Sequence, residues 1–363
     1  MFYVKRRSQE LSAVKAIVFA TLLSIVIMFT GISVILVASG FELKDLIERF
    51  LRPENLISST VIRYTIITTI LSLALLVNVS GGFINLGAEG QIMFSMLAIL
   101  IASVYGLGIF LAFVISIALV MIWMLIPYLV KIYLEGSDVL VSFIQNFIAL
   151  FIANHIVTHV FRGELARPRS PPIDPSINLH YIFSSQSNVL YDFLGRISIE
   201  SLVLVLVAMI LLSYFINRSR IGISMRLLSH SVKTAAISGV NIPRYILLNL
   251  LIASFLITFA SAELLLGGER RIFYNDNARI GVGSMSFGIG YVALSIAILS
   301  TARPYMTIIY SYIFSLGLMF VFSSYGFYSL ILNIAIIGLS LLAALVSELF
   351  LRYEVRITWW RRH

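Results

Sequence analysis

The feature that most constrains this chain is a succession of ten apolar segments, each long enough to cross a lipid bilayer. A membrane-spanning helix needs about 20 mostly apolar residues, and a helix satisfies its own backbone hydrogen bonds in lipid. Because 60% of the 363 residues are hydrophobic and 12% are charged, ten such helices leave no room for a sizeable soluble domain. We therefore predict an all-α polytopic membrane protein in which residues 1–363 form one transmembrane domain. The segments lie at about residues 14–38, 61–80, 84–105, 107–130, 139–161, 197–216, 244–266, 284–302, 305–324 and 326–350.

The distribution of charge predicts how these helices are oriented. If the amino terminus is cytoplasmic, the inner segments carry a large excess of Lys and Arg, whereas basic and acidic residues balance in the outer segments. Excess positive charge on the cytoplasmic side is the normal rule in membrane proteins. We expect a multi-pass protein of the cell membrane with both termini in the cytoplasm, residues 162–196 outside and residues 217–244 inside. The net charge of +9 is spread over short loops, so we expect a lipid bilayer and no nucleic acid as partner.

Residues 39–60, between the first two segments, have the pattern of a helix that lies flat in the membrane interface. Pro53 ends this pattern, and an amphipathic helix of this kind buries one face among the lipid headgroups. The apolar residues with the spacing of a single helical face are Leu43, Leu46, Ile47, Phe50 and Leu51.

Side chains that carry enzyme chemistry are scarce. The absence of cysteine excludes disulfides and Cys-bound metals, and His155 and His159 share a helical face without a third metal ligand. No lysine follows a glycine, so the chain lacks a Walker A loop and any ATP must bind to another chain. We predict a transport subunit with no cofactor or metal, not an enzyme. The alternatives are a secondary transporter driven by an ion gradient, in which Glu89 carries a proton, an intramembrane enzyme and a purely structural subunit.

Two glycine-rich runs interrupt apolar segments, one at Gly81–Gln91 and the other at Gly281–Gly290. Glycine costs about 1 kcal/mol in a helix interior, so both runs should break a membrane helix. The breaks occupy corresponding places in two blocks, helices 2–5 and helices 7–10. Corresponding helices are five crossings apart, an odd number, so the second block is inverted relative to the first. Paired interruptions in inverted repeats indicate a translocation pathway. The alternative is that these glycines only allow close helix packing.

Polar side chains accompany the two breaks. They either contact a solute or hold the broken helix, and for Glu89 a hydrogen bond at the start of the helix it precedes is the structural alternative. Asn and Gln offer both donors and acceptors, which suits a neutral polar solute. The candidate pathway residues are Asn85, Glu89, Gln91, Asn146, Ser284 and Ser286.

The inner loop 217–244 contains a further expected helix, over Ile221–Ala236, that stops at Gly239 and Pro243. A helix lying parallel to the membrane needs one face for the membrane domain and one for a partner. We assign Ile223, Leu227 and Leu228 to the first face and Arg226, His230 and Lys233 to the second.

Three stretches of this sequence resemble motifs of a known protein family. They are Asn85-Leu86-Gly87-Ala88-Glu89-Gly90-Gln91, then Gly136-Ser137-Asp138-Val139 with Gln145-Asn146-Phe147-Ile148-Ala149-Leu150, and Gly222…Arg226…Thr234-Ala235-Ala236…Gly239-Val240-Asn241. Together they resemble the permease subunits of ATP-binding-cassette (ABC) importers of the branched-chain amino acid and ribose type, most closely the subset assigned to nucleosides and simple sugars. The second stretch departs from that family, which usually has Asn-Glu where Ser137-Asp138 stands here.

The resemblance implies half of a pore that works by alternating access. The expected partners are a second permease subunit, more often a paralogue than an identical copy, two cytoplasmic ATPase subunits and an extracytoplasmic solute-binding protein. A nucleoside or simple sugar is the expected solute, with a branched-chain amino acid as the alternative. The residues expected to couple the permease to the ATPase are Gly222, Arg226, His230, Lys233, Thr234, Ala235, Ala236, Gly239 and Asn241.

Overall fold

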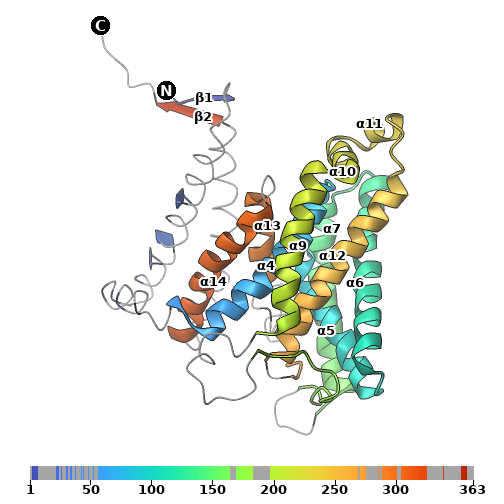
Figure 1. Ribbon diagram of the computed structural model, residues 1–363, viewed down its shortest axis with the longest axis vertical. Coiled ribbons are helices and arrows are strands. Elements are labelled where there is room, and N and C mark those ends of the chain that lie inside the picture. Colours follow the sequence, from blue (N-terminus) through green and yellow to red (C-terminus); the bar gives the residue numbers. More distant parts are fainter. Residues whose placement is uncertain are drawn as a thin grey trace.

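The computed structural model is a bundle of membrane-length helices (Figure 1). It describes residues 56–163, 169–182, 197–268, 270–274, 286, 288–300 and 304–324, the end segments 2–6 and 353–357, and single positions elsewhere. The predicted all-α membrane fold is confirmed, and five of the described helices have the length and composition to cross a membrane. These five are α4 (Ser59–Ser80), α6 (Gly108–Tyr133), α7 (Asp138–His155, continued by the π-helical turn Ile156–Val160), α9 (Ile199–Arg218) and α12 (Ile242–Leu266). The other apolar helices are α5 (Ala88–Val104), α13 (Ile289–Leu299) and α14 (Thr307–Ser324), the last preceded by the short turn Pro304–Met306.

Helix α4 forms the centre of the bundle and packs against α9, α12, α13 and α14. It is rich in hydroxyl groups as well as apolar residues. Thr65 and Thr69 each donate a hydrogen bond to the carbonyl oxygen four residues earlier, at 2.8 and 2.6 Å, and Ser72 does the same at 2.6 Å. These polar groups are therefore satisfied within their own helix, which allows them in an interior without water.

The peripheral helices α6, α7 and α9 expose large apolar side chains on their outer faces. Phe110 on α6 is 76% exposed and Ile210 on α9 is 70% exposed. Continuous apolar surface of this kind marks contact with lipid or with another membrane subunit rather than with water. The exposure pattern agrees with the predicted membrane setting.

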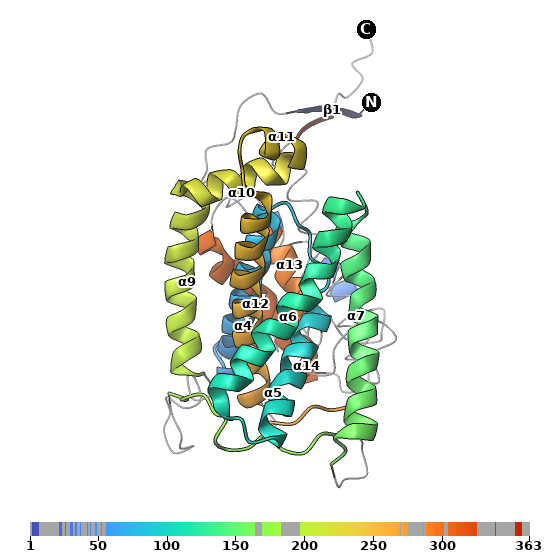
Figure 2. The same cartoon turned by 90° about the vertical axis from the view of Figure 1, so that its right-hand side faces the viewer.

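The two ends of the chain pair with each other in an antiparallel ribbon that the sequence patterns do not predict. Strand β1 (Phe2–Arg6) pairs with β2 (Tyr353–Ile357), with Lys5 opposite Glu354 in the register. Both views place the ribbon at the end of the bundle that also carries α10 (Arg220–His230) and α11 (Val232–Ile237) (Figures 1 and 2). The chain ends and loop 217–244 therefore share one side, as the charge pattern predicts. That this side is cytoplasmic stays a prediction.

The predicted crossing at residues 284–302 is wrong in length. Helix α13 has 11 residues, which span about 16 Å at 1.5 Å per residue, about half of the 30 Å hydrocarbon layer. It begins after Gly288, whose φ of 87° lies in the left-handed region that favours glycine. Helix α5 likewise begins at Ala88, later than expected, because the preceding residues form a non-helical segment. The described residues leave out most of three predicted segments, 14–38, 39–60 and 326–350. Ser284 also lies outside the described residues.

The inner loop contains two helices where one was expected. Ser231 separates them because its backbone is extended and its side chain accepts a hydrogen bond from the Thr234 amide, at 3.2 Å, which starts α11. Pro243 lies in the first turn of α12 and does not end the preceding helix. Proline suits that position because the first turn of a helix has amides without intrahelical acceptors.

Candidate functional site

The candidate site is built around the broken segment, residues 81–87, which joins α4 to α5. Gly81 closes α4 by donating its amide to Val77 O at 3.1 Å. Gly82 then adopts φ +79°, which reverses the chain direction, and the Phe83 amide returns to Asn78 O at 2.9 Å. The remaining backbone groups of the segment need partners from other helices, since unpaired groups at membrane depth cost several kcal/mol each.

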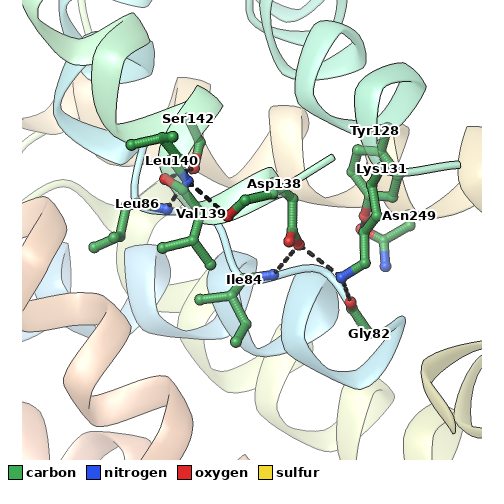
Figure 3. Close-up of polar contacts among 11 residues, drawn as sticks. Gly82, Ile84, Leu86, Tyr128, Lys131, Asp138, Val139, Leu140, Ser142 and Asn249 are labelled. Carbon is green, nitrogen blue, oxygen red and sulfur yellow. Dashed lines mark hydrogen bonds and ion pairs between the residues drawn. The ribbon is translucent and has the colours of Figure 1, made fainter. Parts of the chain in front are cut away.

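One face of α7 supplies those partners. Asp138, Ser142 and Asn146 are spaced four residues apart and therefore lie above one another on a single face. The Asp138 carboxylate accepts the Ile84 amide at 3.0 Å, and Ser142 Oγ accepts the Leu86 amide at 3.1 Å (Figure 3). Asn146 donates its Nδ2 to Leu86 O at 2.6 Å. Three turns of α7 thus hold the broken segment along its length; we call this face the α7 ladder.

The candidate amides form a buried network at the start of α5. Asn85 and Gln91 are fully buried and exchange two hydrogen bonds, of 2.9 and 3.1 Å. Asn146, also fully buried, accepts the Gly90 amide at 2.8 Å and donates to the Tyr291 hydroxyl of α13 at 3.0 Å. The structure therefore brings these three predicted residues together, where they hold the broken helix.

Glu89 lies between the starts of two helices. It is fully buried in the first turn of α5, and its carboxylate accepts the Gly290 amide at 2.6 Å and the Ser286 hydroxyl. A Cβ on Gly290 would lie 2.9 Å from the Glu89 amide nitrogen, so only glycine allows this approach. Helices α5 and α13 thus meet start to start and extend in opposite directions (Figure 2). A negative charge at this junction interacts favourably with the positive ends of both helix dipoles.

An ion pair closes the site on the side of loop 217–244. Lys131, in the last turn of α6, donates to the Asp138 carboxylate at 2.7 Å and to Gly82 O (Figure 3). One turn earlier on α6, Tyr128 stacks on the buried Phe83 ring, with 4.0 Å between ring centroids. The ion pair and the stacked rings therefore fix both sides of the reversal at Gly82.

Helix α10 rests on the bundle through a face that matches the expected one only in part. Leu228 is buried as predicted, together with Gly222 and Met225, whereas Ile223 is 50% exposed and Leu227 is 37% exposed. Gly222 makes the sharp corner after α9 possible, because a Cβ there would lie 2.3 Å from Phe215 O. Of the predicted coupling residues, Gly222 and Ala235 are buried, and the exposed ones are Arg226, His230, Lys233, Thr234, Ala236, Gly239 and Asn241.

Comparison with known families identifies the chain. The sequence profile of the family described as "Branched-chain amino acid transport system / permease component" matches residues 57–345, well over half of the protein. The chain belongs to this permease family. It is accordingly a membrane permease subunit of an ABC transporter and a transport protein rather than an enzyme. No curated protein and no solved structure matches the permease.

The permease contains a second buried polar cluster that the sequence patterns do not single out. Arg63 of α4 donates to Glu263 O at 2.7 Å. The fully buried Glu263 carboxylate of α12 accepts hydrogen bonds from the hydroxyls of Ser198, which caps the start of α9, and Ser201 of α9, at 2.5 and 2.7 Å. Burial and the Glu263 charge raise the pKa of the nearby Tyr181 hydroxyl. An ionisable residue inside an apolar segment is the sequence signal that indicates such a cluster. Arg63 and Glu263 are both residues of this kind. The cluster joins three helices at the end of the bundle opposite α10.

The described part of the permease holds no grouping of three His, Cys, Asp or Glu side chains that suits a metal ion. The His155 and His159 rings lie 4.8 Å apart, centroid to centroid, at the end of α7. A zinc site needs at least three protein ligands. This pair therefore fits two polar residues near the membrane surface, which is where such side chains are commonly found.

Proposed function

We propose that this permease forms half of the solute pathway of an ABC importer and is driven by ATPase subunits that bind α10 and α11. The observation that carries the proposal is the pair α10–α11 itself. Its buried face packs on the bundle, and its exposed face presents Arg226, His230 and Lys233 at one end of the molecule. A second permease subunit, a paralogue in preference to an identical copy, completes the pathway.

The surroundings of Glu89 argue against a secondary transporter. A proton-carrying Glu89 would need access to solvent from each side in turn. Its carboxylate is fully buried and accepts hydrogen bonds from two donors at the junction of α5 and α13. Glu89 therefore acts as a structural residue that joins two helix starts through hydrogen bonds.

We favour a neutral polar solute, a nucleoside or simple sugar. The ionisable groups at the broken segment are already engaged within the chain, with Lys131 paired to Asp138 and Glu89 bonded to Ser286. A zwitterionic amino acid would require charged partners of its own. The amides Asn85, Gln91 and Asn146 then act by positioning the broken helix that borders the pathway.

The end of the bundle opposite α10 is suited to receive a solute-binding protein. The loop that contains residues 169–182 is anchored there by Arg270, whose guanidinium donates to Asn178 Oδ1 and to Ile177 O, both at 2.8 Å. The Asp174 carboxylate accepts the Ser176 amide at 2.7 Å, and hydrogen bonds from Ser176 hold its pKa below the usual range. A platform ordered before binding loses less entropy when a partner docks.

Uptake into proteoliposomes tests the proposal. The permease is reconstituted with its second permease subunit, the ATPase subunits and the binding protein, and uptake of radiolabelled adenosine, ribose and leucine is measured. We expect uptake of adenosine or ribose that requires ATP and the binding protein. Uptake driven by a proton gradient without ATP would establish the secondary transporter instead, and leucine uptake would establish the amino acid alternative.

A bulky substitution on the exposed face of α11 tests the docking surface. Ala236 is exposed whereas its neighbour Ala235 is fully buried, so Ala236→Trp adds volume on the proposed interface without disturbing the bundle. We expect at least about a tenfold loss of ATPase co-purification, the equivalent of about 1.4 kcal/mol. Ser176→Trp, at an exposed position on the opposite end, is the matched control and should leave co-purification unchanged.

A further inference from the structure

We propose that Lys131 and Asp138 are positioning residues that join the broken segment, against which α10 rests, to α6 and α7, so that movement of α10 displaces α5 and α7 together. This inference rests on the proposed function, in which the ATPase moves α10. It adds the route by which that movement reaches the pathway. The route has three steps, each a direct contact between described residues.

The first step is a contact between α10 and the broken segment. A Cβ on Gly82 would lie 2.4 Å from Ser229 Cα and 2.9 Å from Ser229 Cβ. The backbones of the two segments therefore touch without a flexible side chain between them, so a displacement of α10 is transmitted and not absorbed. Beside this contact lies a cavity of about 150 Å³ that is lined by both segments and by Lys131.

The second step is the ion pair. Lys131 donates to Gly82 O and to the Asp138 carboxylate, which also accepts the Ile84 amide. One pair thus ties the two residues flanking Phe83 to the end of α6 and the start of α7. The Lys131 and Asp138 side chains are 34% and 10% exposed, and hydrogen bonds between charged groups are about twice as strong as neutral ones.

The third step is the α7 ladder. Ser142 and Asn146 hold the next residues of the broken segment, and Asn146 also reaches α13 through the Tyr291 hydroxyl. Because the segment and α7 are joined over three successive turns, they move as one body. A displacement of Gly82 is therefore transmitted to the junction of α5 and α13, where the two helix starts meet.

An exposed ion pair between α11 and the turn before α7 serves as a control. Lys233 of α11 lies 3.8 Å from Glu135, and their side chains are 89% and 82% exposed. Exposed pairs of this kind contribute little. Glu135→Gln therefore removes a charge three residues from Asp138 without touching the proposed link.

The test is the ratio of solute transported to ATP hydrolysed in the reconstituted complex. Asp138→Asn keeps an oxygen for the Ile84 amide and removes the ion pair. We expect normal assembly and ATP hydrolysis in this variant, with transport per ATP lowered about tenfold, in line with the strength of a charge-assisted hydrogen bond. Lys131→Met should behave alike, whereas Lys131→Arg, which keeps the charge and the donors, and Glu135→Gln should match the unsubstituted complex.

A distance measurement separates a link from a merely structural role. The chain has no cysteine, so spin labels can be placed at the exposed positions Ile223 on α10 and Leu140 on α7. The distance between the labels should stay constant on nucleotide trapping in the unsubstituted complex and change in Asp138→Asn. If the unsubstituted complex transports solute with ATP and Asp138→Asn transports the same amount of solute per ATP, the link alone is overturned. Absence of ATP-dependent uptake in the unsubstituted complex would overturn the proposed function, and the link with it.

Discussion

Removing the Glu89 carboxylate is expected to destabilise the junction of α5 and α13 more than any other single change at the broken segment. In Glu89→Ala the Ser286 hydroxyl and the Gly290 amide lose their acceptor inside the bundle. A buried donor left without a partner costs about 1–3 kcal/mol, so the two together predict a loss of about 2–6 kcal/mol. Glu89→Gln keeps one acceptor oxygen and removes the charge at two helix starts, each worth about 0.3–2 kcal/mol. Release of the desolvation cost of a buried charge offsets part of this, which predicts a loss of about 1–2 kcal/mol.

The measurement is the free energy of unfolding in mixed detergent micelles titrated with SDS, followed by the helical circular dichroism signal. The expected order of stability is unsubstituted, then Glu89→Gln, then Glu89→Ala. Glu135→Gln removes an exposed carboxylate, 82% exposed in the turn before α7, and should change nothing. If Glu89→Ala unfolds within about 0.5 kcal/mol of the unsubstituted protein, the size of an ordinary surface change, the carboxylate does not hold the two helices together.

Three further predictions follow from the geometry. Gly82→Ala should lower the free energy of unfolding by about 2–4 kcal/mol, because it combines backbone strain at φ +79° with a clash against α10. Gly106→Ala, at φ +63° with nothing within 4 Å, should show only the strain of about 1–2 kcal/mol, and equal losses in the two variants would disprove the contact. Ser142→Ala removes the acceptor of the Leu86 amide and should cost about 1–3 kcal/mol in the same titration; a stability equal to that of the unsubstituted protein would refute the ladder. Cysteines at the exposed Ser176 and Ser238 should react with an impermeant maleimide from outside and inside the cell, respectively, and labelling of both from one side would contradict the topology.

The sequence alone predicts much of the membrane architecture. Apolar segments must be about as long as the bilayer is thick, so eight of the ten predicted segments correspond to described helices, although α13 is only half as long as a crossing. Glycine runs locate the break before α5 because their backbone preferences are local. The expected return of both chain ends to the side of α10 and α11 agrees with the described strands.

Only the tertiary structure decides which residues meet across the bundle. Helical spacing shows that Asp138, Ser142 and Asn146 share a face, but not that this face holds residues 84–90. It also assigns Ile223, Leu227 and Leu228 of α10 to the bundle. Leu228 is buried as predicted, but Ile223 and Leu227 are exposed, and Gly222 and Met225 are buried in their place. The sequence determined where helices begin and break because those effects act within a few residues of the chain. Pairing between distant segments was decided by packing: in a bilayer apolar side chains suit both lipid and interior, so hydrophobicity no longer distinguishes the inner face of a helix from the outer one.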